Sequence, residues 1–560
     1  MCRTTAKPTI CPVDAERPDP GENAAPPLHS EIPGKMTTAF RLAHRVVTTA
    51  SCRSACRRGP RAPMPLTVRK SQIVPAVAMN QKIAVGVVFV SAMFMNIMDI
   101  TIVNVALPTI GRDFHIAPTA VDGIVIAYLV SLAVFIPASG WLGDRFGGKR
   151  VLMSAIVVFT LGSVLCGLAQ NLTELVLFRV IQGAGGGMLA PVGMAMLFRV
   201  FPPSERVRAS SILTIGTTLA PAIGPVLGGL LVSDLSWRWV FFVNLPIGIA
   251  AVTFGALCLE RSAPQEAGVF DVPGFLLGGA GLGLVMYGVS EGPLKSWSSP
   301  TVITTCVAGV ALLAVLVRVE LRTPHPMVDL RLLSARLFRS SSGIIFLVSA
   351  AFLGTLYLIP LYFQDARGLS ALQSGLSTFP EAFGVMIGAQ FASRLIYPRL
   401  GPRRHITIGL IGLAGTMLLL TQISLTTSLW LMRGLMFLLG LIVAQIFVPG
   451  QAASFAMISP AATGRASTLF NTGRQVGSAV GVAVLSTVLI GVGSTQAAGG
   501  ISHPNLGAYH LAFFAAALFA LAGTVFSLTI HDSDAAETMV RRRRPTQSPE
   551  QPLSVPESVV

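Results

Sequence analysis

The stretch Gly140-Trp-Leu-Gly-Asp-Arg-Phe-Gly-Gly-Lys-Arg150 decides the fold, because it is a short charged segment between two long apolar runs. The first run ends near Leu142 and the second begins at Val151. Helices joined by so short a connection are antiparallel neighbours. The glycines of the stretch permit a sharp turn, and its charged side chains mark a polar boundary. A basic loop that only fixes the orientation of the two helices is the simpler interpretation.

Composition indicates a polytopic helical membrane protein. The 560 residues are 52% hydrophobic and only 12% charged, whereas a soluble protein carries roughly 25% charged residues. The net charge of +16 then serves orientation in the membrane, because no aromatic-interleaved basic patch or nucleic-acid motif accompanies it. The seven cysteines lack the spacing of metal ligands, so neither a metal site nor a disulfide framework is expected.

Residues 1–81 differ in composition from everything that follows. They are rich in Pro, Ala, Ser and Arg and contain no long apolar run, so we expect a disordered basic leader. A secretory signal would need a continuous apolar segment, and the acidic residues argue against an organelle transit peptide. Met36, Met64 and Met79 are alternative starts, and we expect the natural protein to begin at Met64 or Met79.

From Lys82 onward, apolar runs alternate with short polar loops. Each run approaches the ~20 residues that cross about 30 Å of hydrocarbon. Fourteen transmembrane helices are predicted: 83–107, 120–142, 151–169, 173–198, 209–232, 239–259, 272–289, 301–319, 340–363, 374–396, 405–423, 429–449, 468–492 and 509–530. Basic residues concentrate in alternate loops, which predicts that these loops and both termini are cytoplasmic. We expect a multi-pass protein of the cell (plasma) membrane, and specifically of the bacterial inner membrane.

An internal repeat predicts two lobes. The segment Arg394-Leu-Ile-Tyr-Pro-Arg-Leu-Gly-Pro-Arg-Arg404 resembles a decayed copy of the opening stretch. The resulting fold class is all-α, with two six-helix lobes plus two inserted linker helices. The predicted boundaries are 82–260 for the first lobe, 261–336 for the linker, 337–530 for the second lobe, and 531–560 for a disordered cytoplasmic tail. Transporters are commonly built from such repeats and bind their substrate between the halves.

Four ionisable residues lie inside the predicted spans: Asp99, Arg179, Glu381 and Arg433. Each costs about 2.5–3.5 kcal/mol in a bilayer even on lenient scales, so each requires a reason. Their distances along the runs place all four in the outer half of the membrane. We predict that Asp99 and Arg179 interact, directly or through water, and that Glu381 and Arg433 are candidate cavity charges. A static packing pair, and a helix-end charge for Glu381, are the alternative interpretations.

Several motifs together resemble one family. The opening stretch resembles the signature loop of the major facilitator superfamily, and Asp99-Ile-Thr-Ile-Val-Asn-Val-Ala-Leu-Pro108 resembles the first-helix motif of its fourteen-span drug:proton antiporter branch (EmrB/QacA type). Matching motifs also begin at Arg179, Asn244 and Asn471, and the segment 224–229 resembles the antiporter motif, with Gly224, Pro225, Gly228 and Gly229. The resemblance covers about 82–530. Gly123, Gly148 and Glu381 depart from the family pattern, which puts the substrate range in doubt more than the fold.

The resemblance implies a proton-coupled antiporter that exports amphipathic small molecules (multidrug efflux), which we expect to be cationic or neutral, with proton coupling assigned to Asp99 and Arg179. It is a secondary active transporter and not an enzyme. Protons as the coupling ion are the only cofactor expected, and the partners are small-molecule substrates and the lipid bilayer, with no nucleic acid, in a monomer. A dedicated exporter of one metabolite, lipid or siderophore, and a non-transporting receptor or scaffold, are the alternatives. No phosphate-binding Gly-x-x-x-x-Gly-Lys-Ser/Thr is present to support an ATP-driven pump.

The opening stretch is also predicted to act as a latch. We expect Asp144 to bond across the lobe interface near the inner end of run thirteen when the inner side is closed. Arg474 is the candidate partner. The residues of this candidate gating loop are Gly143, Asp144, Arg145, Gly147, Lys149 and Arg150.

Overall fold

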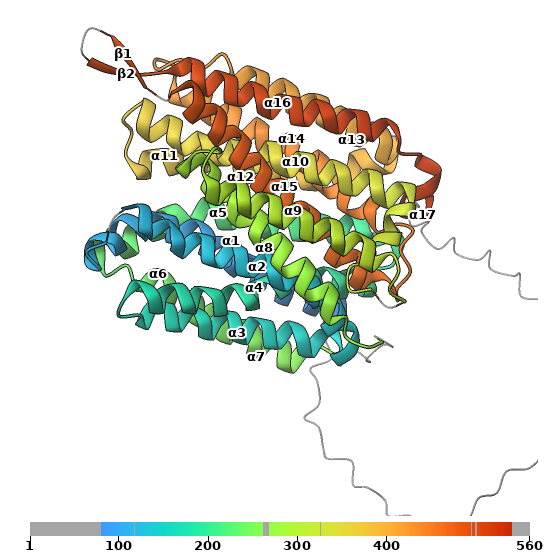
Figure 1. Cartoon of the computed structure of the whole chain (residues 1–560). Helices are drawn as coiled ribbons and strands as arrows, with labels where there is room; N and C mark the ends of the chain where they lie inside the picture. The colour runs from blue at the N-terminus through green and yellow to red at the C-terminus, as the bar shows by residue number, and fades with distance from the viewer. Residues whose placement is uncertain are drawn as a thin grey trace, which may run out of the picture. The chain divides into compact units, whose positions relative to one another are not determined.

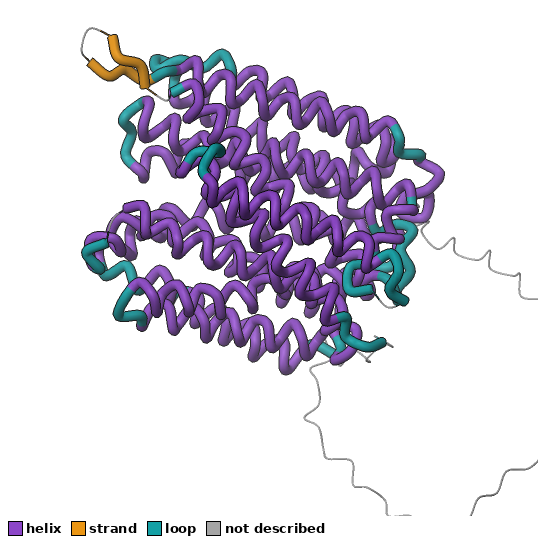
Figure 2. The backbone as a smooth tube through the Cα atoms, in the orientation of Figure 1, coloured by secondary structure: helices purple, strands orange, loops and turns teal. Residues whose placement is uncertain are grey.

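The computed structural model describes residues 80–116, 118–260, 268–324, 326–493, 495–498 and 501–539. The predicted leader, apart from its last two residues, and the final part of the predicted tail lie outside these ranges. Within them the chain is helical except for connecting loops and one antiparallel hairpin of β1 (Thr495–Ala498) and β2 (Ile501–Pro504), drawn in orange in Figure 2. The predicted all-helical fold class is thereby confirmed.

Figure 1 shows the helices in chain order, and we group them by the predicted boundaries of the lobes and the linker. The first lobe contains α1 (Gln81–Asp113), α2 (Pro118–Phe146), α3 (Gly148–Leu168), α4 (Leu172–Val200), η1 (Pro203–Glu205), α5 (Arg206–Asp234), α6 (Trp239–Phe242) and α7 (Asn244–Cys258). The linker contains α8 (Val272–Lys295), α9 (Pro300–Glu320) and η2 (Leu330–Ser334). The second lobe contains α10 (Arg336–Leu361), η3 (Tyr362–Ala366), α11 (Ala371–Thr378), α12 (Pro380–Phe391), η4 (Ala392–Ile396), α13 (Tyr397–Leu420), α14 (Leu429–Ser454), α15 (Thr463–Val492) and α16 (Leu506–Leu528).

Twelve helical segments of the described chain are long and apolar enough to cross a membrane. The other two predicted spans, 374–396 and 405–423, are also helical. The first of these is divided among α11, α12 and the π-helical turn η4, and the second lies in α13 after a kink. The total of fourteen spans therefore stays a prediction.

The predicted repeat of the opening stretch has a backbone counterpart. Gly147 has a φ of 86° immediately before α3, and Gly401 has a φ of 73° at the kink of α13. Only glycine adopts such angles without strain, so both loops turn at the same place in the motif. The second copy lacks the acidic residue of the first, because Pro398 stands where Asp144 does.

Residues 531–539, which we predicted to be disordered, form η5 (Asp532–Ala535) and α17 (Ala536–Met539), so this part of the tail prediction is wrong. The segment is ordered because it binds the kinked region of α13. Asp532 Oδ1 accepts from the Arg403 backbone N–H at 2.9 Å, and the Tyr397 and Thr538 hydroxyls are 2.7 Å apart.

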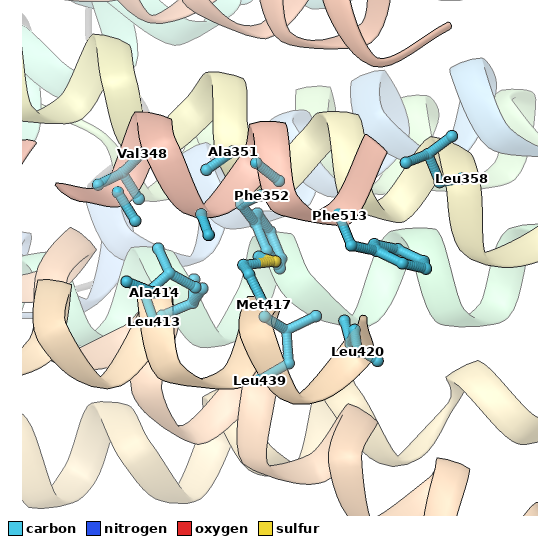
Figure 3. Packing of buried hydrophobic residues seen from close by; sticks show 14 of the residues in the cluster. Val348, Ala351, Phe352, Leu358, Leu413, Ala414, Met417, Leu420, Leu439 and Phe513 are labelled. Carbon is cyan, nitrogen blue, oxygen red and sulfur yellow. The ribbon is translucent and has the colours of Figure 1, made fainter. Parts of the chain in front are cut away.

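Each lobe has an apolar core supported by close helix contacts. In the second lobe, Phe352 and Val348 of α10 face Met417 and Leu413 of α13, and Phe513 of α16 closes the cluster (Figure 3). In the first lobe, α4 packs between α2 and α3. A methyl group at Gly187 would lie 2.5 Å from the Leu132 carbonyl oxygen, so these backbones approach at a distance that only glycine permits.

The linker helix α8 packs against both lobes. Leu282 and Met286 of α8 form a buried cluster with Ala133 of α2, and Val476 of α15 packs against the same cluster. The Trp297 indole just beyond α8 donates to Thr487 Oγ1 of α15 at 2.6 Å. In contrast, α9 exposes a row of large apolar side chains, namely Ile303, Val307, Val310, Val315 and Val317.

The two lobes meet along a seam at one end of the helices. We call this end, which carries Asp144, Arg199, Arg206 and Arg465, the basic end. Ser467 Oγ of α15 donates to the Pro191 carbonyl of α4 at 2.7 Å, and Phe198 stacks on Phe455 with ring centroids 4.6 Å apart. The hydrogen bonds between lobes within the described ranges gather here, so the basic end is closed in this conformation.

Candidate functional site

A buried ion pair joins α1 and α4. Arg179 Nη1 donates to Asp99 Oδ2 at 2.5 Å, and both side chains are at most 1% exposed. Asp99 lies in the interior of α1, and Arg179 lies two turns into α4, so neither charge can reach a helix end or solvent. The structure thus places in direct contact the two charges that the sequence argument paired.

Two uncharged amides complete the environment of the Asp99 carboxylate. Gln182 Nε2 donates to Asp99 Oδ1 at 2.7 Å, and Asn244 Nδ2 donates to the same oxygen at 3.2 Å. Gln182 Oε1 in turn accepts from Arg179 Nη1 at 2.9 Å. Asn244 begins α7 and also donates to Ser163 of α3 at 3.0 Å. One carboxylate therefore connects four helices of the first lobe through a continuous set of hydrogen bonds.

The guanidinium of Arg179 is enclosed by aromatic rings and a backbone carbonyl. Its Cζ lies 4.5 Å from the centre of the Tyr128 ring and 5.6 Å from that of Phe241. Arg179 Nε donates to the Ile124 carbonyl at 3.3 Å. Rings that face a desolvated cation stabilise it by about 2 kcal/mol or more. The rings and the carbonyl thus hold the guanidinium in place opposite the Asp99 carboxylate.

The bonds among α1, α4 and α7 depend on the charge of the Asp99 carboxylate. A deprotonated Asp99 attracts Arg179 strongly, because both are removed from water. A protonated Asp99 loses most of that attraction and one of its acceptor sites, which weakens the bonds between α1, α4 and α7. A proton on this carboxylate would therefore alter how the helices of the lobe hold together.

The sequence argument missed Gln182 and Asn244. Both lie inside motifs that the resemblance marked. An uncharged amide costs less in an apolar run than a charge does, so its presence there is a weaker sign of function. Spacing contains a usable signal for Gln182, because it follows Arg179 by three residues and so shares its helix face. Asn244 had no such signal, since its partner lies on a helix distant in the sequence.

The antiporter motif lies against the helix that carries Asp99. A methyl group at Gly224 would be 2.0 Å from Thr101 Oγ1, and one at Gly228 would be 3.0 Å from Ile102 Cγ1. The motif therefore brings α5 against the turn of α1 that directly follows Asp99. Gly229 faces open space, and the Pro225 side chain lies outside the described part of the chain.

The two candidate cavity charges are not joined to the Asp99 site. Glu381 lies in the first turn of α12, is 2% exposed, and its Oε1 has no hydrogen-bond partner. Arg433 lies near the start of α14 with its Cζ 4.7 Å from the Trp430 ring centre, and its Nε is likewise unpaired. The described residues contain no ion pair between these two side chains.

The candidate gating loop lies at the seam, with a different partner from the one predicted. Asp144 Oδ1 accepts from Arg199 Nη2 of α4 at 2.7 Å, and the carboxylate rests against Gly464 in the first turn of α15. A helix N-terminus carries partial positive charge, which favours a carboxylate there. Arg474 lies eleven residues beyond the start of α15, about 16 Å along the helix, so its assignment as the partner of Asp144 is wrong in this conformation.

The other residues of the loop have separate environments. Lys149 Nζ donates to the Ala256 carbonyl at 3.0 Å and also to the Leu259 carbonyl, which ties the loop to the end of α7. Gly143 and Gly147 are buried, whereas the side chains of Arg145 and Arg150 are exposed. Arg199 Nε also donates to the Pro460 carbonyl at 3.3 Å, so it joins the loop to the second lobe.

Comparison with solved structures supports the fold. The human organic anion transporter MFSD10 (TETRAN) superposes with a TM-score of 0.58 and 16% sequence identity, covering 80% of this chain and 100% of that chain. The major facilitator superfamily proton:xylose symporter XylE superposes with a TM-score of 0.56 and 14% identity, covering 80% of this chain and 96% of that one. At such identities the likeness concerns the fold alone.

Sequence relatives are named for drug resistance. The Multidrug resistance protein B homolog of Mycobacterium tuberculosis is 34% identical over 407 residues, covering 72% of this chain and 75% of the relative. The Putative multidrug resistance protein MdtD of Klebsiella pneumoniae is 31% identical over 464 residues, covering 80% and 95%. The model of the Major Facilitator Superfamily matches residues 89–482. The chain therefore belongs to the major facilitator superfamily and is a multi-pass membrane transporter.

Proposed function

We propose that this transporter is a proton-coupled antiporter that exports amphipathic small molecules from the cytoplasm. The observation that carries the proposal is the buried Asp99–Arg179 ion pair, with its amide ligands, inside one lobe. A charge buried in the membrane marks an ion pathway more often than a packing contact. The names of the relatives supply the expectation of drug export.

The proton and the substrate act on the same equilibrium between two conformations. Protonation of Asp99 weakens the bonds among α1, α4 and α7, and the contact of α5 with α1 transmits the change to the interface with α12. Asp144 and Arg199 stabilise the closed basic end. A substrate that binds between the lobes and a proton on Asp99 thus favour opposite steps of one cycle.

The proposal includes an orientation in the membrane. The start of α1 and the end of the described chain both lie at the basic end, because Lys82 pairs with Glu205 at 2.5 Å and Arg336 pairs with Asp534 at 2.8 Å. An excess of arginine and lysine favours the cytoplasm. We place the basic end there, in a bacterial inner membrane, with a monomer as the working unit and protons as the only coupling ion.

The test uses everted membrane vesicles, a panel of amphipathic dyes and an imposed pH gradient. Wild-type vesicles should accumulate dye only while the gradient lasts, and Asp99→Asn should abolish this dependence. Asp113→Asn is the matched control, because Asp113 lies on the same helix but is exposed and bonds only to Trp237 within the described chain, at 2.9 Å. Gradient-driven movement that survives Asp99→Asn unchanged would refute the coupling assignment.

A second outcome separates multidrug export from a narrower activity. Gradient-dependent export of one endogenous metabolite, lipid or siderophore, with no dye transported, would favour the dedicated exporter. Transport of neither class, from a folded and inserted protein, would favour a receptor or scaffold.

A further inference from the structure

Arg474 has no partner for its charge among the residues that the structure describes. It lies in the interior of α15, yet no carboxylate of the described chain is within 4 Å of its guanidinium, and only its backbone oxygen takes part in a hydrogen bond, from Ser478 at 2.9 Å. An arginine stays protonated in proteins, so the charge cannot be removed by loss of a proton. A lone cation inside a membrane protein is costly and requires an anion.

The position of Arg474 is directly beyond the closed seam. Ser467, Asn471 and Arg474 share one face of α15, because their spacing is that of successive helical turns. Ser467 bonds to Pro191 of α4 at 2.7 Å, and Asn471 Nδ2 lies 3.6 Å from Met194 Sδ of the same helix. Arg474 follows one turn later, on the side away from the basic end. Its face therefore points into the space between the lobes, just past the seal.

Open space lies beside Arg474. A methyl group at Gly473 would meet no heavy atom within 4 Å, although Gly473 shares a face with the buried residues Phe470 and Gly477. Asn471 Oδ1 and Thr472 Oγ1 are buried without hydrogen-bond partners, and Arg474 itself is partly exposed. Arg474 and Asn471, one turn before it on the same face, therefore both carry polar groups that lack partners in the described chain.

We propose that Arg474 binds an anionic group, a carboxylate, sulfonate or phosphate, on an amphipathic substrate held between the lobes. The guanidinium supplies a charge-assisted, bidentate contact to this anionic group. The apolar remainder of the substrate lies against the surrounding helices. The inference rests on the proposed export function, and it narrows the substrate class to amphipathic molecules that carry a negative charge.

The test compares two dyes with one aromatic core. Dansyl sulfonate carries the anion, and dansyl amide is its neutral counterpart. Each is titrated by fluorescence into the full-length protein in lipid nanodiscs, without a pH gradient. Wild type should bind the sulfonate about tenfold more tightly than the amide. Arg474→Gln should reduce this preference to less than about twofold while leaving amide binding unchanged, which also shows that the variant is folded.

Two further variants sharpen the result. Arg474→Lys should retain part of the preference, because it keeps the charge but loses the bidentate geometry. Arg322→Gln removes an exposed arginine beyond α9 and should match wild type. A preference that persists in Arg474→Gln, a wild type without preference, or an equal loss of both dyes in Arg474→Gln would overturn the proposal. Since no proton gradient is used, these outcomes are independent of the coupling test on Asp99.

Discussion

The Asp99–Arg179 pair should show a large coupling free energy in a double-mutant cycle. Asp99→Asn leaves the Arg179 guanidinium buried without a counter-charge, and Arg179→Gln does the same to the Asp99 carboxylate. Removing one member of a buried pair costs about 3–5 kcal/mol of unfolding free energy. The double variant contains no buried charge at this site, so it should be more stable than the sum of the two losses predicts.

The chain provides a matched control for this cycle. Lys82 and Glu205 also approach to 2.5 Å, but their side chains are 32% and 25% exposed, against 1% and 0% for Arg179 and Asp99. The N···O distance is thus equal in the two pairs, whereas their burial differs. An exposed pair is screened by water and contributes at most about 1 kcal/mol. We expect a coupling free energy of at least about 3 kcal/mol for the buried pair and less than about 1 kcal/mol for the exposed pair.

The assay is reversible unfolding in mixed micelles, with sodium dodecyl sulfate as denaturant and tryptophan fluorescence as readout. All four proteins of each cycle are measured at one lipid-to-detergent ratio. Equal coupling free energies in the two cycles would refute the reasoning, because burial would then have no effect. Transport should be lost in every variant of the buried cycle, including the stable double variant, since none contains the proton-binding carboxylate together with its cation.

Three further perturbations have defined outcomes. Gly440→Ala places a methyl group 2.0 Å from the Glu381 carbonyl oxygen and should cost about 1–3 kcal/mol of unfolding free energy or more. Gly434→Ala on the same helix meets nothing within 4 Å and should not destabilise the protein. Similar losses in the two variants would contradict the helix packing. Glu381→Met removes a buried carboxyl oxygen that has no donor and should raise the unfolding free energy by about 1 kcal/mol, so a clear loss would indicate an unrecognised partner. Asp144→Asn should loosen the basic end and increase thiol labelling of Ser467→Cys in a cysteine-free background; unchanged labelling together with unchanged transport would exclude the latch.

Prediction from the sequence succeeds where a charge is misplaced in an apolar run. Asp99 and Arg179 could be paired in advance because each is costly alone and their depths along antiparallel helices are similar. The same reasoning fails for Asp144, because its partner was sought among the charges of run thirteen. Arg199 of its own lobe supplies the ion pair, and the backbone of α15 near Gly464 supplies the contact across the seam. Backbone partners leave no trace in a list of charged residues.

The span boundaries show a similar limit. Hydropathy locates the apolar runs, but it does not show where a helix changes its winding. The run 374–396 is interrupted near Phe379 and ends in the π-helical turn η4, and neither feature follows from the apolar pattern. The ordered residues 531–539 were missed because their stability comes from Asp532 and Thr538, which bind residues more than a hundred positions earlier.

The position of α8 makes the two sides of the transporter different, because a linker helix covers the contact between the lobes on one side. On one side, α8 covers the contact between α2 and α15. The opposite face of α8 packs against α9, which carries the row of exposed apolar side chains. On the other side α5 and α12 meet directly, joined by the bond of Ser211 Oγ to the Ala389 carbonyl at 3.1 Å. The linker therefore makes the described helix bundle asymmetric within the plane of the membrane, because α8 shields the contact between α2 and α15 while the contact between α5 and α12 has no such cover among the described linker helices.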